Sequence, residues 1–368
     1  MSFALAVTAL LGAAYAYLAA RLVGGTIGAV LLAAPFICIW IVPVMYWGSP
    51  RSREGFFARL VHRASYLSMA WVSFALVLTL ARDLLLVATH WGAALAATHA
   101  WIASAGVPVV FGGSLAAMAL GAAAAFRGPR VESVDIALPD LHPDLDGYRI
   151  VQISDLHVGP NIGRRYVERV VAKARALKPD LIALTGDIVD GPIARLAPDV
   201  APLAELARDG KAYFVLGNHD CYAGADVWVE HFRSLGLHVL LNSHEIIGHG
   251  GARLLVGGVV DPAYRRTRPQ ISLQGAPLAD VRLLLAHNPR LAPLGAAAGF
   301  DLQLSGHTHA GQFFPWTLAV RLVHAPHVAG LSREGRMTVY VSAGTGTWGP
   351  PVRFGTHPEL TLLRLVRA

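Results

Sequence analysis

The sequence has few cysteines and few charged residues, and each shortage excludes a class of protein. Its 368 residues include two cysteines, Cys38 and Cys221, which are too few for a disulfide framework and lack the CxxC spacing of thiolate–zinc or redox sites. Charged residues make up 15% of the chain, whereas soluble domains carry roughly 25%. The mean hydropathy is +0.47. We therefore expect part of the chain to lie in lipid.

Lysine is also scarce, although the net charge is +7. Only three of the 31 basic residues are lysines, and no run of five or more basic residues occurs. Nucleic-acid binding usually needs a dense basic patch, so the composition disfavours nucleic acid as a partner. Arginines beside apolar segments fit a membrane-facing role better.

The first 127 residues form an apolar region that predicts about four transmembrane helices. An apolar helix of roughly 20 residues crosses a bilayer. The N-terminus lacks the basic start of a cleaved signal peptide and so indicates an anchor. The predicted spans are residues 3–20, 22–47, 66–88 and 107–126.

Arginines set the predicted orientation, because loops rich in arginine stay in the cytoplasm. We predict an integral, multi-pass protein of the cytoplasmic (inner) membrane, with both ends and the C-terminal half on the cytoplasmic side. A fifth span within residues 84–104 remains an alternative that would move the C-terminal half to the other side. The arginines that follow the second and fourth spans are Arg51, Arg53, Arg59, Arg63, Arg127 and Arg130.

The texture changes after the apolar region. Residues 128–147 are predicted to be a juxtamembrane linker and a first strand, and residues 148–368 a catalytic domain. Short apolar runs alternate there with polar, helix-like stretches such as 163–178 and 226–236, and the later part is mostly strands. The pattern indicates an α/β fold.

Five apolar runs of this domain end in residue types that bind metals. Strand ends are rigid, and the loops beyond them can converge on one crevice. In an extended segment residues i and i+2 point the same way. We therefore expect Asp155 and His157, and likewise His307 and His309, to present their side chains as pairs. Gly186, Gly217 and Gly306 precede ligands and permit close backbone approach. The candidate ligands are Asp155, His157, Asp187, Asn218, His287, His307 and His309.

The mixture of ligand types indicates the kind of metal. Imidazole, carboxylate and amide oxygen without thiolate suit Mn²⁺, Fe or Zn²⁺. Seven ligands exceed the need of one tetrahedral ion, whereas two ions that share a carboxylate use them all. Such pairs, roughly 3.5–4 Å apart, promote in-line displacement at phosphorus. The positive site would attract a phosphate ester and stabilise its developing charge.

Taken in order, the motifs D-x-H, G-D-x-x-D, G-N-H-D, a lone His and G-H-x-H resemble those of the calcineurin-like metallophosphoesterase superfamily. The closing stretch "SAGTGTWGPPVRFG" is similar to its membrane-associated bacterial branch. The resemblance implies a four-layer fold, in which two mixed β-sheets pack face to face with helices outside. It also implies that Asp155, His157 and His309 hold one metal, that Asn218, His287 and His307 hold the other, and that Asp187 bridges them.

The resemblance implies a mechanism as well. A metal-bound hydroxide attacks phosphorus, His219 acts as the general acid for the leaving oxygen, and Asp190 orients His219. Asp220 is expected to support the ligands from behind. The protein is thus predicted to be a metal-dependent phosphoesterase, a hydrolase of ester bonds. Whether it cleaves phosphodiesters, monoesters or pyrophosphates stays open.

Apolar residues follow the last ligands and suggest the type of substrate. Phe313 and Trp316 can form an apolar wall that admits a lipid-linked phosphoester, although packing in the core explains them too. Arg353 is a candidate contact for the substrate phosphate. Two alternatives remain: a metal-dependent nuclease, and a non-catalytic membrane transporter or scaffold with a phosphoesterase-like binding domain.

Overall fold

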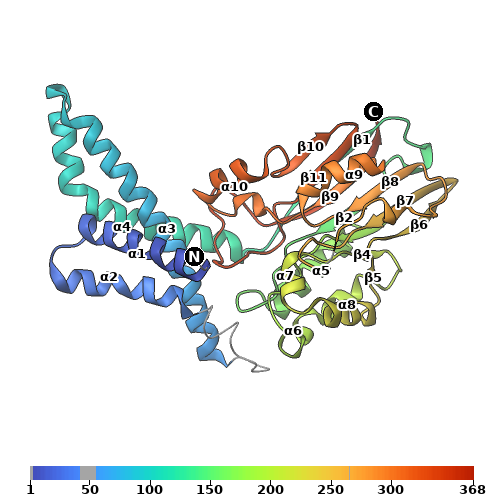
Figure 1. The fold of residues 1–368 in the computed structure, drawn as a ribbon, viewed down its shortest axis with the longest axis horizontal. Helices are drawn as coiled ribbons and strands as arrows, with labels where there is room; N and C mark the ends of the chain where they lie inside the picture. Colours follow the sequence, from blue (N-terminus) through green and yellow to red (C-terminus); the bar gives the residue numbers. More distant parts are fainter. Residues whose placement is uncertain (1–2, 42–54, 265) are drawn as a thin grey trace. The chain divides into compact units, whose positions relative to one another are not determined.

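The computed structural model describes residues 3–41, 55–264 and 266–368. Their contacts divide the chain into a helical unit and an α/β unit. The helical unit comprises Met1–Ala123 with Gly349–Phe354, and the α/β unit comprises Ala124–Trp348 with Gly355–Ala368. Figure 1 shows the elements of both units.

Four helices follow one another from the N-terminus. Among the described residues, three stretches are long and apolar enough to cross a membrane: Leu5–Leu22, Leu60–His90 and Ala93–Phe126. The helices are α1 (Phe3–Leu22), α2 (Gly25–Ile39), α3 (Phe56–His90) and α4 (Ala96–Phe126).

The helices differ in extent from the predicted spans. Helices α3 and α4 have 35 and 31 residues, because the polar residues at their ends do not interrupt a helix. Residues 84–104 form the end of α3, a turn and the start of α4, and so are not a helix of their own. The predicted second span begins as α2, and its last part with Tyr46 and Trp47 lies outside the described residues.

Two six-stranded mixed sheets form the α/β unit, which confirms the predicted fold class. Both sheets combine parallel with antiparallel neighbours. The first sheet has the order β1 (Arg130–Leu138), β12 (Glu359–Arg367), β2 (Arg149–Ile153), β3 (Leu181–Leu184), β4 (Ala212–Phe214) and β5 (His238–Val239). The second has the order β10 (Gly330–Glu334), β11 (Met337–Val341), β9 (Leu302–Ser305), β8 (Val281–Leu285), β7 (Ala252–Gly258) and β6 (Ser243–His249).

The sheets pack face to face, and their strands are buried on both sides. Ile150 of β2 and Leu283 of β8 belong to the core between the sheets, whereas the next residue, Val151, belongs to the core under the outer helices. This alternation explains why the strands are continuous apolar runs in the sequence.

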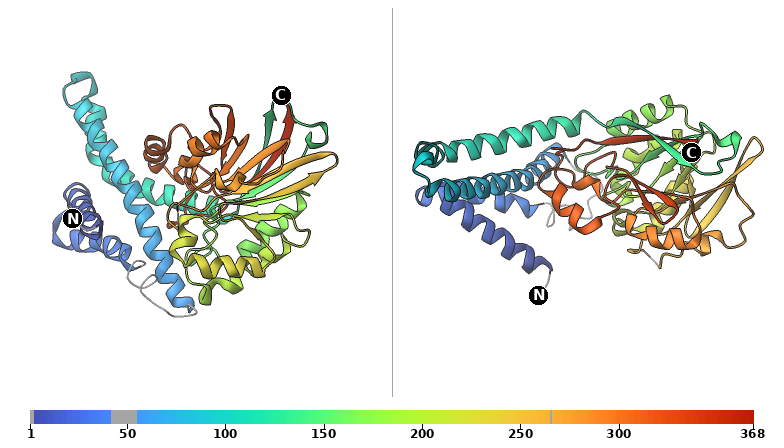
Figure 2. Two further views of the ribbon diagram at one scale, coloured as in Figure 1. Left: turned by 45° about the vertical axis from the view of Figure 1, so that its right-hand side comes forward. Right: turned by 90° about the horizontal axis from the view of Figure 1, so that it is seen from above.

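Helices cover the outer faces of the sheets (Figure 2). Apolar side chains of α5 (Arg164–Ala176), α6 (Ile193–Val200) and α8 (Ala225–Ser234) pack on the first sheet, and those of α9 (Ala292–Ala298) on the second. Helices α5 and α8 lie at the predicted stretches 163–178 and 226–236. Two further helices, α7 (Asn218–Tyr222) and α10 (Trp316–His324), lie beside the candidate site.

Candidate metal centre

The predicted ligands lie just beyond the carboxyl ends of five strands. Strands β2, β3 and β4 are parallel neighbours in one sheet, and β8 and β9 are parallel neighbours in the other. Their ends therefore face the same edge of the sandwich. Gln152 of β2 donates a hydrogen bond of 2.8 Å to the carbonyl of Ser305 in β9, which ties the two sheets together at this edge.

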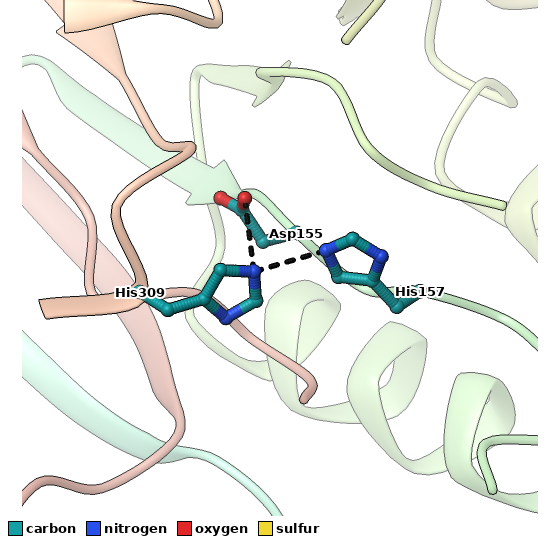
Figure 3. A group of neighbouring side chains, drawn as sticks. All are labelled: Asp155, His157 and His309. Carbon is teal, nitrogen blue, oxygen red and sulfur yellow. Dashed lines mark hydrogen bonds and ion pairs between the residues drawn. The ribbon is translucent and has the colours of Figure 1, made fainter. Parts of the chain in front are cut away.

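Asp155, His157 and His309 form a first ligand group. Their donor atoms lie within 4.8 Å of one another, and all three side chains are buried. The Nε2 atoms of His157 and His309 are 2.9 Å apart, and His309 Nε2 lies 3.3 Å from Asp155 Oδ1. Figure 3 shows the two rings and the carboxylate pointing toward one another.

Asp187, His287 and His307 form a second group within the same limit of 4.8 Å. His287 Nε2 lies 3.1 Å from Asp187 Oδ2 and 3.3 Å from His307 Nδ1. Asn218 joins this group, because its Oδ1 atom is 2.9 Å from His307 Nδ1. All seven predicted ligands thus lie in these two groups.

One oxygen of Asp187 faces both groups. Its Oδ2 atom is 3.1 Å from His287 Nε2 and 3.8 Å from His157 Nε2. The other oxygen, Oδ1, accepts a hydrogen bond of 2.8 Å from the backbone N–H of His219. The hydrogen bond to Oδ1 fixes the carboxylate, and Oδ2 points toward the imidazoles of both groups.

Partners behind the ligands fix their orientation. His157 Nδ1 lies 2.7 Å from Asp190 Oδ1, and His287 Nδ1 lies 2.8 Å from the carbonyl of Thr185. Both rings therefore donate through Nδ1 and direct the lone pair of Nε2 into the site, as metal-ligating histidines do. Ser154 donates a hydrogen bond of 2.5 Å to Asp155 Oδ2.

Buried carboxylates hold protons on two of the imidazoles. Burial lowers the pKa of His157, but the carboxylates of Asp190, Asp187 and Asp155 together outweigh this effect and raise that pKa to about 9. Burial also lowers the pKa of His287, but Asp187, Asp155 and Asp261 together outweigh it and raise that pKa to about 10. Burial and the neighbouring His287 lower the pKa of His307 to about 3, so its imidazole is neutral at pH 7. Donor atoms and charge both fit divalent cations, which would take the place of these protons.

The backbone brings the paired ligands together in a way that differs from the prediction. Asp155 and His157 have φ values of 53° and 50°, and those of His307 and His309 are 73° and 50°. These residues are left-handed, a conformation that is uncommon outside glycine. The expectation of extended i, i+2 pairs was therefore wrong: tight left-handed turns aim the side chains instead. Such strained residues gather at functional sites.

Close approach explains two of the glycines, as predicted. A Cβ atom at Gly306 would lie 2.1 Å from Asp155 Oδ2, and one at Gly217 would lie 2.1 Å from Asp187 Oδ1. Any side chain at these positions would displace a ligand. The structure confirms that the loops carrying the ligands need glycine there.

His219 lies at the more open side of the site. Its side chain is 14% exposed, against 1% for His157. Its Nδ1 atom is 2.9 Å from Asp190 Oδ1 without the geometry of a hydrogen bond, whereas His157 is well aligned with the same oxygen. Asp190 is thus the hydrogen-bond partner of His157 rather than of His219. The sequence did not predict this pairing with His157.

Two exposed aromatic rings flank His219, an arrangement that was not predicted. The rings of Tyr222 and Trp348 each lie 5.7 Å from that of His219, and both side chains are more than half exposed. Gln312 holds Trp348 through two hydrogen bonds of 2.8 and 2.9 Å to its backbone. In the sequence, only the glutamine that ends the motif "GHTHAGQ" could have pointed to this contact between Gln312 and Trp348.

The predicted substrate residues fall into different environments. Phe313 is only 5% exposed and Trp316 is 50% exposed. Arg353 is buried in the segment grouped with the helical unit, and its backbone N–H donates to the carbonyl of Gly121 in α4 at 2.9 Å.

Comparison with known proteins identifies the family. A family model described as calcineurin-like phosphoesterase matches residues 148–311. A transmembrane protein with metallophosphoesterase domain from Danio rerio is 35% identical over 66% of this chain and 59% of its own length. Metallophosphoesterases named as uncharacterised are 32% identical in Campylobacter jejuni, over 66% of this chain and 64% of theirs, and 32% identical in Aquifex aeolicus, over 64% of this chain and 91% of theirs.

The chain belongs to the calcineurin-like metallophosphoesterase family. It spans about 60% of the length of the first two relatives. The family is one of metal-dependent phosphoesterases, which agrees with the two ligand groups.

Proposed function

We propose that the protein is a membrane-anchored hydrolase of phosphoester bonds that uses two divalent ions. The observation that carries this proposal is the Oδ2 atom of Asp187, 3.1 Å from one histidine group and 3.8 Å from the other. A carboxylate oxygen between two sets of ligands is the arrangement that two-metal sites need.

Each set of ligands has its own task in this proposal. Asp155, His157 and His309 hold one ion, and Asn218, His287 and His307 hold the other, with Asp187 shared. Two such ions would activate water and polarise the phosphoryl oxygens. The side chain of Asp190 and the carbonyl of Thr185 keep Nε2 of His157 and His287 directed at the ions.

His219 is proposed as the general acid. Its side chain is 14% exposed, against 1% for His157 and 0% for His287, and Asp190 lies 2.9 Å behind its Nδ1 atom. Its Nε2 atom is then free to deliver a proton to the leaving oxygen. We expect His219→Ala to keep its metals and lose about 10²- to 10⁴-fold in turnover. Near wild-type turnover of an ester with a poor leaving group would remove this role.

The proposed substrate is a lipid-linked phosphoester. Helix α10 has no buried side chain, although most of its residues are apolar. Trp316, Leu318 and Leu322 are 50%, 53% and 89% exposed. The ring of His324, at the end of α10, lies 5.4 Å from that of the ligand His307. This apolar surface therefore begins beside the metal centre, where acyl chains of a substrate can cover it.

One assay tests both levels of the proposal. The full chain, stripped with chelator and reloaded with Mn²⁺, is offered phosphomonoesters, phosphodiesters and pyrophosphates, each as a soluble ester and as the same headgroup in mixed micelles. We expect hydrolysis, with a preference for micelles that Leu318→Gln/Leu322→Gln removes. Equal rates in solution and in micelles would refute the lipid substrate alone.

The same assay separates the alternatives. Cleavage of oligonucleotides with Mn²⁺, but of no lipid ester, would establish the nuclease. Two bound metals without hydrolysis of any phosphoester would establish the scaffold or transporter. Asp187→Asn serves as the inactive control, because it removes the shared ligand and keeps the size of the side chain.

The proposed location is the cytoplasmic membrane, with the α/β unit on the cytoplasmic side. The arginines that follow the predicted spans support this side. A fluorescent protein fused to the C-terminus should fluoresce, and alkaline phosphatase at the same position should be inactive. The opposite pair of results would place the unit outside.

A further inference from the structure

A cavity of about 420 Å³ lies beside the residues that follow α4. Its walls come from the α4–β1 connection, from α5 and from the segment before β12, all within the α/β unit. We call it the juxtamembrane pocket. It shares no lining residue with the two ligand groups.

The charge of the juxtamembrane pocket is positive. Arg127, Arg130 and Lys173 line it, and none of the lining residues is acidic. Within the described part of the chain, no carboxylate lies within 4.0 Å of these three cations. The Lys173 ammonium is held in place by a hydrogen bond of 2.8 Å to the carbonyl of Pro129.

His357, which also lines the juxtamembrane pocket, interacts with a carboxylate outside it. His357 Nε2 lies 2.8 Å from Glu132 Oε1, so this nearby carboxylate is occupied by the imidazole. The lysine and the two arginines remain to bind an anion. Guanidinium groups match the oxygens of phosphate in a fork-like geometry, and lysine adds a point charge.

The position of the juxtamembrane pocket selects among phosphate compounds. The stretch Ala93–Phe126 has 34 residues and is apolar enough to cross a membrane. Arg127 is the next residue after it. A helix of this kind ends at the membrane surface, where the phosphates of lipid headgroups lie. Cations at this height attract anionic lipids.

We propose that the juxtamembrane pocket binds the phosphate of an anionic glycerophospholipid. The lipid would join the α4–β1 connection to α5 and hold the start of the α/β unit at the bilayer surface. Inorganic phosphate has the same chemistry, and measurements in neutral nanodiscs distinguish the two sources. Binding of this lipid does not depend on the reaction at the metal centre.

The test compares lipid retention by the full chain and two variants. Each protein is placed in nanodiscs of phosphatidylcholine with or without phosphatidylglycerol, and the lipid that stays bound after detergent extraction is measured by native mass spectrometry. The pocket variant is Arg127→Gln/Arg130→Gln/Lys173→Gln. The control variant, Arg333→Gln/Arg336→Gln/Lys211→Gln, removes the same charge from exposed positions outside the pocket.

We expect the wild type and the control to retain phosphatidylglycerol and the pocket variant to lose it. Each cation near an anionic surface contributes a factor of about five, so three should weaken retention about a hundredfold. Equal retention by the pocket variant, or equal loss by the control, would overturn the proposal. So would a rise in Tm with millimolar inorganic phosphate in neutral nanodiscs as large as that with phosphatidylglycerol. Metal content, unchanged in all three proteins, shows that the variants are folded.

Discussion

Asp220→Asn changes one atom of a fully buried side chain behind the metal centre. The carboxylate of Asp220 accepts four backbone hydrogen bonds of 2.8–3.0 Å. Oδ2 accepts from the N–H groups of Asp187 and Gly217, and Oδ1 accepts from those of Ile188 and Val189. The side chain thereby ties the loop of the shared ligand to the loop of Asn218.

Asparagine can satisfy only half of these donors. Whichever way its amide turns, an NH₂ group faces two backbone N–H groups, which then have no acceptor. A buried donor without a partner costs about 1–3 kcal/mol, so the change should destabilise the α/β unit by about 2–6 kcal/mol. Because the two loops carry Asp187 and Asn218, the variant should also bind metal more weakly.

Calorimetry of the full chain in detergent measures the first effect, and metal analysis measures the second. Asp209→Asn is the matched control, since Asp209 is exposed and remote from the metal ligands. We expect a clear fall in Tm and in bound metal for Asp220→Asn and neither for the control. An Asp220→Asn variant with the Tm and the metal content of the wild type would refute this account of Asp220.

Three other changes test separate parts of the centre. Gly306→Ala places a Cβ atom 2.0 Å from Ser154 Oγ and 2.1 Å from Asp155 Oδ2; it should remove metal from the Asp155 group, whereas Gly248→Ala, with open space around it, should not, as measured by metal analysis. Asp190→Asn should weaken metal binding about 10- to 100-fold because it supports His157; if titration shows unchanged affinity and only turnover falls, Asp190 serves His219 alone. Metal binding at pH 7 should release about two protons, because the pKa values of His157 and His287 are raised to about 9 and 10 and both rings must lose a proton to bind metal. Affinity should therefore fall as the pH drops below 9, and calorimetric heats independent of the buffer would contradict this.

Much of the fold could be predicted because both faces of its strands are buried. Runs such as Leu181–Leu184 are entirely apolar and end in glycine or polar residues, so each strand and its end are visible in the sequence. The metal ligands follow these ends, so the sequence alone predicts that they share one edge of the fold. The family resemblance supplied the two mixed sheets packed face to face, but not the order of the strands, which is set by contacts between residues far apart in the chain.

The finer geometry could not be read from residue spacing. The left-handed backbone at Asp155 and His309 depends on hydrogen bonds that the folded loops make. In residues other than glycine, no local sequence pattern predicts this conformation. The sharing of Asp190 between His157 and His219 has the same origin, since the three residues come from different loops.

The limits of the helices were also hidden. Hydropathy marks the apolar part of a segment, but a helix continues through polar residues that do not break it. Helix α3 therefore runs from Phe56 to His90, well beyond the predicted 66–88.

Electron paramagnetic resonance of the full chain loaded with Mn²⁺ tests the central claim most directly. If the Oδ2 atom of Asp187 joins two ions, the spectrum should show a spin-coupled pair and metal analysis should give two Mn²⁺ per chain. Asp187→Asn should abolish the coupling. A wild-type spectrum of isolated, uncoupled Mn²⁺, with one ion per chain or fewer, would contradict the two-metal centre.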